Sequence, residues 1–183
     1  PDALDLNQIR DMARAARVRT AMLEYVDGGV SDLIADLSEG DATAWQNYGI
    51  AARARGEGAV RPGSLIVGRG AAEARPVLGL TPTAQALALI FNAVDQGSVR
   101  TGARSDSENL EAVSFVTPTR KLVVAMHALA DMPVTISGLP RGRYRLVMAG
   151  PDAAGTIATR TADQAGVLKL DARKNATYTL TEI

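Results

Sequence analysis

Helical and strand-like segments alternate over residues 6–50, with very little chain between them. Apolar residues recur at helical spacing in 6–16 and 30–37, and runs typical of strands cover 18–25 and 42–50. Such alternation predicts β/α units, in which parallel strands carry their loops at their C-terminal ends. Ligands of βα proteins bind at that end, so the residues that close each strand become the first candidates for function.

The first strand-like run ends in Leu23-Glu24-Tyr25, just before the break at residues 27–29. A buried strand of this kind would deliver Glu24 to the rim of the sheet. Gln46 and Tyr48 close the second run, and we expect them on the same rim. A Glu after a strand is also often a solvated loop residue or a helix-cap partner, and the residues alone leave these alternatives open.

Residues 53–79 are rich in Gly, Ala and Arg. We expect a long loop there, overhanging the same rim. Its arginines are candidates for contact with an acidic ligand, although scattered arginines more commonly form a solvated surface. Thr81-Pro82 then begins a helix that stops near Gly97, because Thr caps a helix and Pro fits its first position.

From about Leu110 the pattern changes to short β-type runs separated by turn signals such as Gly138-Leu139-Pro140. This pattern predicts a small antiparallel β-sandwich. The polar residues 98–109 mark the boundary. We therefore expect an α/β domain over residues 1–105 and an all-β domain over residues 106–183.

The charge and residue content exclude several functions. Lys and Arg number 20, as do Asp and Glu, so the formal charge is zero and we expect neither nucleic acid nor a membrane surface as a partner. The chain has no cysteine and one histidine, His127, which we interpret as a strand-end or surface residue. Neither a multi-histidine metal site nor a Ser-His-Asp triad is expected, and we predict no cofactor. The residue content leaves the cellular compartment undecided, with secretion and the periplasm both open.

The order of these parts resembles the C-terminal end of retaining glycoside hydrolases of clan A, of the family 30 and family 39 types. Three departures are Gln96-Gly97 where that family usually has Gly-Pro, Asn47-Tyr48 where aromatics are commoner, and the Arg-rich loop. The matching segments are Leu23-Glu24-Tyr25 as the end of barrel strand seven, Asp36-Leu37 in the helix after it, residues 43–48 as strand eight, 84–91 and 97–103 as the last barrel helix and its exit, and 110–115, 121–124 and 134–139 as the start of the sandwich.

The resemblance implies the last β/α units of a (β/α)8 barrel followed by the sandwich, with a carbohydrate as substrate. It implies that Glu24 is the nucleophile and that Trp45, Tyr25, Gln46 and Tyr48 contact the sugar. Trp45 has an alternative role as a packing residue of the barrel wall. The family's acid/base Glu follows strand four, to which no segment here corresponds, so we expect this chain alone to be inactive.

Two other functions stay open. The sandwich could be a carbohydrate-binding or structural module beside a degenerate barrel remnant, or the protein could be a family member that has lost activity and acts by interaction. The chain begins at Pro1 rather than Met. The resemblance implies further β/α units upstream and the remaining barrel segment of the parent chain as a partner, whereas a natural start at Pro1 would favour a short protein with a binding or structural role.

Overall fold

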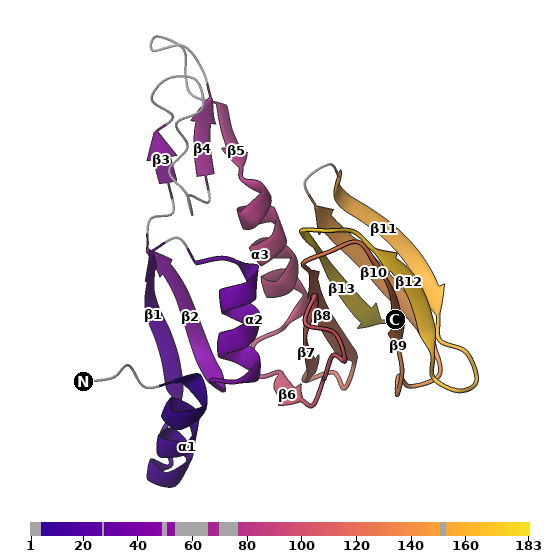
Figure 1. Ribbon diagram of the computed structural model, residues 1–183, viewed down its shortest axis with the longest axis horizontal. Coiled ribbons are helices and arrows are strands. Elements are labelled where there is room, and N and C mark those ends of the chain that lie inside the picture. The colour runs from indigo at the N-terminus through magenta and orange to yellow at the C-terminus, as the bar shows by residue number, and fades with distance from the viewer. Residues whose placement is uncertain (1–4, 27, 49–50, 54–65, 70–76, 151–152) are drawn as a thin grey trace. The chain divides into compact units, whose positions relative to one another are not determined.

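The computed structural model describes residues 5–26, 28–48, 51–53, 66–69, 77–150 and 153–183. The chain divides into two compact units, residues 1–84 and 85–183, called unit 1 and unit 2 below. Helices and strands are mixed, as predicted (Figure 1). The predicted boundary between residues 105 and 106 stays a prediction.

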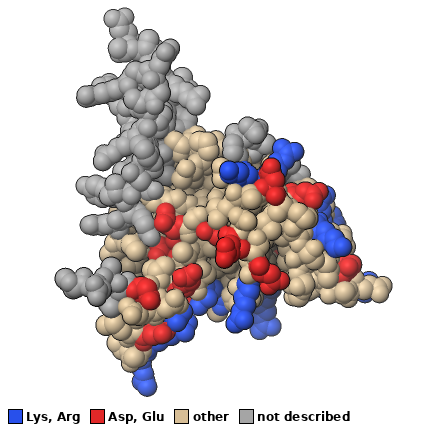
Figure 2. Space-filling model, in the orientation of Figure 1, with Lys and Arg blue, Asp and Glu red and all other residues tan. Residues whose placement is uncertain are grey.

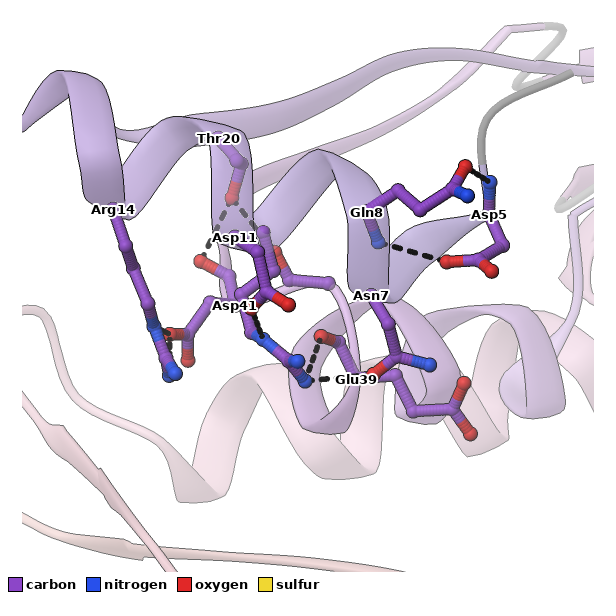
Figure 3. A network of polar contacts seen from close by, with 10 residues as sticks. Asp5, Asn7, Gln8, Asp11, Arg14, Thr20, Glu39 and Asp41 are labelled. Atoms are coloured by element: carbon purple, nitrogen blue, oxygen red, sulfur yellow. Dashed lines mark hydrogen bonds and ion pairs between the residues drawn. The ribbon is translucent and has the colours of Figure 1, made fainter.

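Unit 1 begins with two helix–strand repeats: α1 (Leu6–Ala16), β1 (Thr20–Val26), α2 (Val30–Ser38) and β2 (Ala42–Tyr48). Asp5 and Gln8 form a capping box at the start of α1, in which each side chain accepts the other's backbone N–H (Figure 3). β1 and β2 pair in parallel, joined by α2. All four elements match the periodicity in the sequence to within a few residues.

A network of polar contacts holds α1 and the first residue of β1 to the chain just before β2 (Figure 3). The Thr20 hydroxyl contacts the carbonyl oxygens of Gly40 and Asp41 at 3.0 and 2.9 Å. Arg14 of α1 forms an ion pair with the Asp41 carboxylate. These contacts tie α1, β1 and β2 together at the N-terminal ends of both strands.

The Arg-rich stretch is not the single long loop expected from the sequence. Three short strands, β3 (Ala51–Arg53), β4 (Ile66–Arg69) and β5 (Val77–Leu80), form a small sheet in the order β3-β4-β5. Runs of three or four residues among Gly and Arg are too short to show a strand period, which is why the pattern missed them. Residues 54–65 and 70–76 of that stretch lie outside the described residues.

The helix α3 (Pro82–Ala93) crosses the boundary between the two units. As predicted, Thr81 caps it: the Thr81 hydroxyl accepts a hydrogen bond from the Ala84 N–H at 3.1 Å. No helix within the described residues is long and apolar enough to span a membrane.

Unit 2 contains a six-stranded antiparallel sheet in the order β11-β10-β13-β8-β7-β6 and a two-stranded antiparallel sheet of β12 and β9. β6 was not expected, because residues 98–109 had been interpreted as a polar boundary. The strands are β6 (Val99–Thr101), β7 (Leu110–Val116), β8 (Leu122–Ala128), β9 (Met132–Ile136), β10 (Arg143–Gly150), β11 (Ala153–Thr161), β12 (Leu168–Ala172) and β13 (Ala176–Glu182).

The core of unit 2 lies between these two sheets. Leu180 and Tyr144 of the larger sheet are fully buried and cluster with Val134 and Leu168 of the smaller one. The Tyr144 hydroxyl donates to the Pro140 carbonyl oxygen at 2.6 Å, so the one polar atom of that side chain is satisfied. Alternation along β8 and β13 sends every second side chain into this core: Val124, Met126 and Ala128 of β8, and Ala176, Tyr178 and Leu180 of β13.

The turn before β12 depends on a glycine. Gly166 has a φ of +71°, and a Cβ there would lie 2.4 Å from the Leu139 carbonyl oxygen. Its own carbonyl oxygen accepts the Leu139 N–H at 3.0 Å, so the two segments cannot move apart without losing this bond. Neither the backbone conformation nor the space admits a larger residue.

We expect Gly166→Ala to destabilise the protein more than Gly138→Ala. Both positions have positive φ, but a Cβ at Gly138 would meet nothing within 4 Å. Gly138→Ala should therefore cost about 1–2 kcal/mol for the left-handed backbone alone, whereas the clash adds to that cost at Gly166. Urea unfolding of both variants measures the difference. Equal losses would show that Leu139 moves aside.

Candidate functional site

The pairing of β1 with β2 is irregular at Glu24. Met22 pairs with Trp45 and Tyr25 pairs with Asn47, so two residues of β1, Leu23 and Glu24, face a single residue of β2. An extra residue of this kind bends its strand and re-aims a side chain, and such bulges are over-represented next to active sites. The sequence contains no signal for it, because the register appears only when the two strands are paired.

Because the two strands are parallel, their C-terminal ends meet at one edge. Val26, the last residue of β1, pairs with Tyr48, the last residue of β2. The backbones of Glu24, Tyr25 and Gln46 lie within two residues of that pair. The structure therefore brings together four of the five predicted site residues at one strand edge, as the expected β/α order requires.

The fifth predicted residue, Trp45, has its side chain against α2. The indole Nε1 donates to the Asp36 carboxylate at 3.0 Å, and Asp36 is only 1% exposed. Trp45 itself is half-buried. Of the two roles left open for Trp45, this contact favours packing between strand and helix. Adjacent strand residues alternate between faces, which puts the exposed Gln46 on the other side of β2.

Asp36 is the polar residue whose importance the sequence analysis missed. In the sequence it stood out only within Asp36-Leu37, one of the segments that resemble the glycoside hydrolase family. The available signal was its position: it lies three residues after Leu33, on the helix face that also buries Val30 and Ile34. A carboxylate on a buried helix face needs a hydrogen-bond partner, and the chain's single Trp supplies one.

We expect Asp36→Ala to destabilise unit 1 by about 2–3 kcal/mol, because it removes a hydrogen bond to a charged group and leaves the indole N–H without that acceptor. The matched variant Asp36→Asn keeps an acceptor oxygen and should lose less. The emission of the only Trp, followed through urea unfolding, reports on this contact directly. Wild-type stability and emission in both variants would show that the bond contributes nothing.

The single histidine lies in unit 2, near the end of β8. Its Nδ1 is 2.9 Å from the Thr177 hydroxyl oxygen, and its cross-strand neighbours are Glu111 and Thr177. Burial lowers the pKa of His127, and the negative charge of Glu111 opposes that shift in part. This row of three side chains is part of the sheet and belongs to a different unit from Glu24.

The lowered pKa of His127 predicts a pH-dependent stability. Since the folded protein binds the proton less readily than the unfolded chain, the stabilisation is complete above the ordinary pKa of 6.5 and is lost as the pH falls through the lower folded value. We expect the urea midpoint of the wild type to fall between about pH 8 and pH 5, and that of His127→Gln to fall less. Parallel profiles would contradict this.

Within the described residues, no three His, Asp or Glu side chains are grouped so that they could hold a metal ion. The residue types at the C-terminal ends of β1 and β2 include a carboxylate, Glu24, an amide, Gln46, and two phenols, Tyr25 and Tyr48.

Comparison with known proteins gives matches in structure only. No protein-family model matches the chain, and no curated protein matches it in sequence. Solved structures similar to it include the catalytic domain of a GH30 xylanase C from Talaromyces cellulolyticus (TM-score 0.70, 13% identity, 91% of this chain and 41% of that chain). A GH30 endoxylanase from Clostridium papyrosolvens C71 has a TM-score of 0.71 and 11% identity, and the match covers 98% of this chain and 46% of that chain. A conserved exported protein from Bacteroides fragilis has a TM-score of 0.73 and 13% identity, and the match covers 96% of this chain and 42% of that chain.

The chain has the fold of a part of glycoside hydrolase chains, and the likeness includes the family 30 type. This confirms the predicted resemblance at the level of fold. The chain spans less than half the length of these three structures. At 11–13% identity the likeness concerns the fold alone, so activity and substrate have to be argued from the residues.

Proposed function

We propose that this chain is the C-terminal part of a retaining glycoside hydrolase, with Glu24 as the catalytic nucleophile. The observation that carries the proposal is the parallel pairing of β1 with β2, which brings the Glu24 backbone, at a bulge, to the C-terminal edge of the strands. Catalytic residues of βα barrels come from this end of the strands. The structural likeness to glycoside hydrolases supports the same assignment.

In finer detail, we propose that residues 1–105 supply the last β/α units of a (β/α)8 barrel and residues 106–183 an antiparallel β-sandwich. The two facing sheets of unit 2 and their shared core support the sandwich. The parallel pair supports the barrel, because sheets of parallel strands occur almost only with helices covering them and with further strands beside them.

The surface of α1 and β1 indicates where the remaining barrel segment would bind. Met12, Val18 and Leu23 are 60%, 61% and 56% exposed, and within the described residues β1 pairs only with β2. A neighbouring β/α unit would bury these side chains and pair with the other edge of β1. We propose that this partner comes from the same parent chain.

The proposed reaction proceeds in two displacements. The Glu24 carboxylate attacks the anomeric carbon while a second carboxyl group, about 5–5.5 Å away, protonates the departing glycosidic oxygen. This forms a glycosyl ester on Glu24. The second group then takes a proton from water, the water oxygen attacks the same carbon, and the ester bond breaks, so the configuration is retained. That second group belongs to the partner segment, so this chain alone does not complete the reaction.

We propose a carbohydrate substrate held by the residues beside Glu24. Tyr25 and Tyr48 offer aromatic rings of the kind that stack on sugars, and Gln46 offers both a donor and an acceptor for hydroxyl groups. The Asp36 contact gives Trp45 a positioning role behind β2 rather than a stacking role. Holding β2 against α2 in this way fixes the strand that carries the other contacts.

The nucleophile can be identified by trapping its ester. In the protein that combines this chain with the rest of the barrel, a 2-deoxy-2-fluoroglycosyl fluoride should lose its anomeric fluoride and leave one fluoroglycosyl group on the peptide that contains Glu24. Glu24→Gln should prevent labelling and lower kcat by roughly 10³-fold or more.

Glu39→Gln is the matched control, because Glu39 is an exposed carboxylate at the end of α2. In this variant, the labelling of the Glu24 peptide and kcat should both be unchanged. Full activity of Glu24→Gln, or a label on another carboxylate, would reject the assignment. A protein that neither turns over nor is labelled would be the inactive family member.

A further inference from the structure

An open pocket lies at one end of unit 2, where Ala172 and Ala176 of the core border it. β9 and β13 begin at this end, and β10 and β12 end there. The pocket has a volume of about 720 Å³ and is lined only by residues between 131 and 176. That volume is within the range of about 300–1,000 Å³ typical of small-molecule sites.

Small residues at the strand ends keep the pocket open. Ala172 and Ala176 line it and are 3% and 1% exposed. Gly150 also lines it, and a Cβ at that position would lie 3.3 Å from the Cβ of Ala176, so larger side chains have no room there. Met132 and Met148 complete the apolar part of the lining. The pocket therefore offers C–H surface as well as polar groups.

Charged residues of both signs surround this surface: Asp131, Asp171, Arg173 and Lys174. All four belong to the described residues, all are exposed, and the structure contains no ion pair between any of them. On the face that Figure 2 shows, acidic and basic side chains are interspersed. The two carboxylates and two cations sum to zero formal charge, so neither a simple anion nor a simple cation is favoured over the other.

The turn that carries the two cations is held in place by hydrogen bonds. The Lys174 N–H donates to the Asp131 carboxylate at 2.7 Å, and the Arg173 N–H donates to the Tyr178 hydroxyl oxygen at 2.8 Å. The Asn175 N–H donates to the Ala128 carbonyl oxygen at 2.7 Å. A turn fixed in this way loses little freedom when a ligand binds, which lowers the cost of binding.

We propose that this pocket binds a neutral oligosaccharide, as a second sugar site separate from Glu24. Sugar hydroxyls both donate and accept, so one ring can donate to the carboxylates of Asp131 and Asp171 and accept from Arg173 and Lys174. The C–H face of the ring fits against Met132 and Met148. The choice of a sugar among neutral polar ligands rests on the proposed function. The pocket itself is inferred from its lining residues and does not depend on that function.

The test uses the 183-residue chain labelled with ¹⁵N and titrated with xylohexaose, followed by amide chemical shifts. We expect saturable shifts confined to residues 131–133, 148–150 and 171–176, with a Kd on the order of 1 mM. Asp171→Ala and Lys174→Ala should each weaken binding at least tenfold. Lys169→Ala is the matched control, since Lys169 is an exposed cation of β12 outside the pocket, and should bind as the wild type does.

Three results would overturn this proposal: no saturable shift up to roughly 10 mM sugar, shifts centred elsewhere, or equal affinity in the pocket and control variants. The outcome is independent of the nucleophile assignment. Pocket shifts without labelling of Glu24 would reject the nucleophile and keep this site, and labelling of Glu24 without pocket shifts would reject this site alone.

Discussion

The parallel pairing of β1 and β2 is the constraint on which the proposed active site depends. A tight turn cannot join two parallel strands, so α2 must cross between them, and both strands then end at one edge. The contacts of Thr20 with Gly40 and Asp41 hold the opposite ends together. A slip of one residue would turn Trp45 away from Asp36 and change the residue that faces Glu24.

The two units differ in how their strands are hydrogen-bonded and in how their apolar side chains are buried. In unit 2, antiparallel ladders join six strands, and a second sheet covers a core in which Leu180 and Tyr144 are fully buried. In unit 1, β1 has one described partner, and Met12 and Val18 are mostly exposed. Unit 2 thus has its own core and its own pocket, whereas unit 1 presents the exposed apolar surface to which we propose that another β/α unit binds.

Several elements were predictable because their signals are local. The spacing of apolar residues and the cap at Asp5 predicted residues 6–16 as a helix, and α1 has these bounds. Turn residues predicted most strands of unit 2, although not the three-residue strand β6. The family resemblance came from the order of short motifs, and the likeness to solved structures at 11–13% identity confirms it at the level of fold.

The sequence by itself determined the alternation of helices and strands, the change to β-structure after residue 110, and Glu24 as a candidate at a strand end. Only the tertiary structure decided that Trp45 contacts Asp36, that a bulge falls at Glu24, and that four charged residues surround one pocket. The physical reason is distance along the chain. Caps and periodicity act within a few residues, whereas register and pockets depend on strands that meet only after folding.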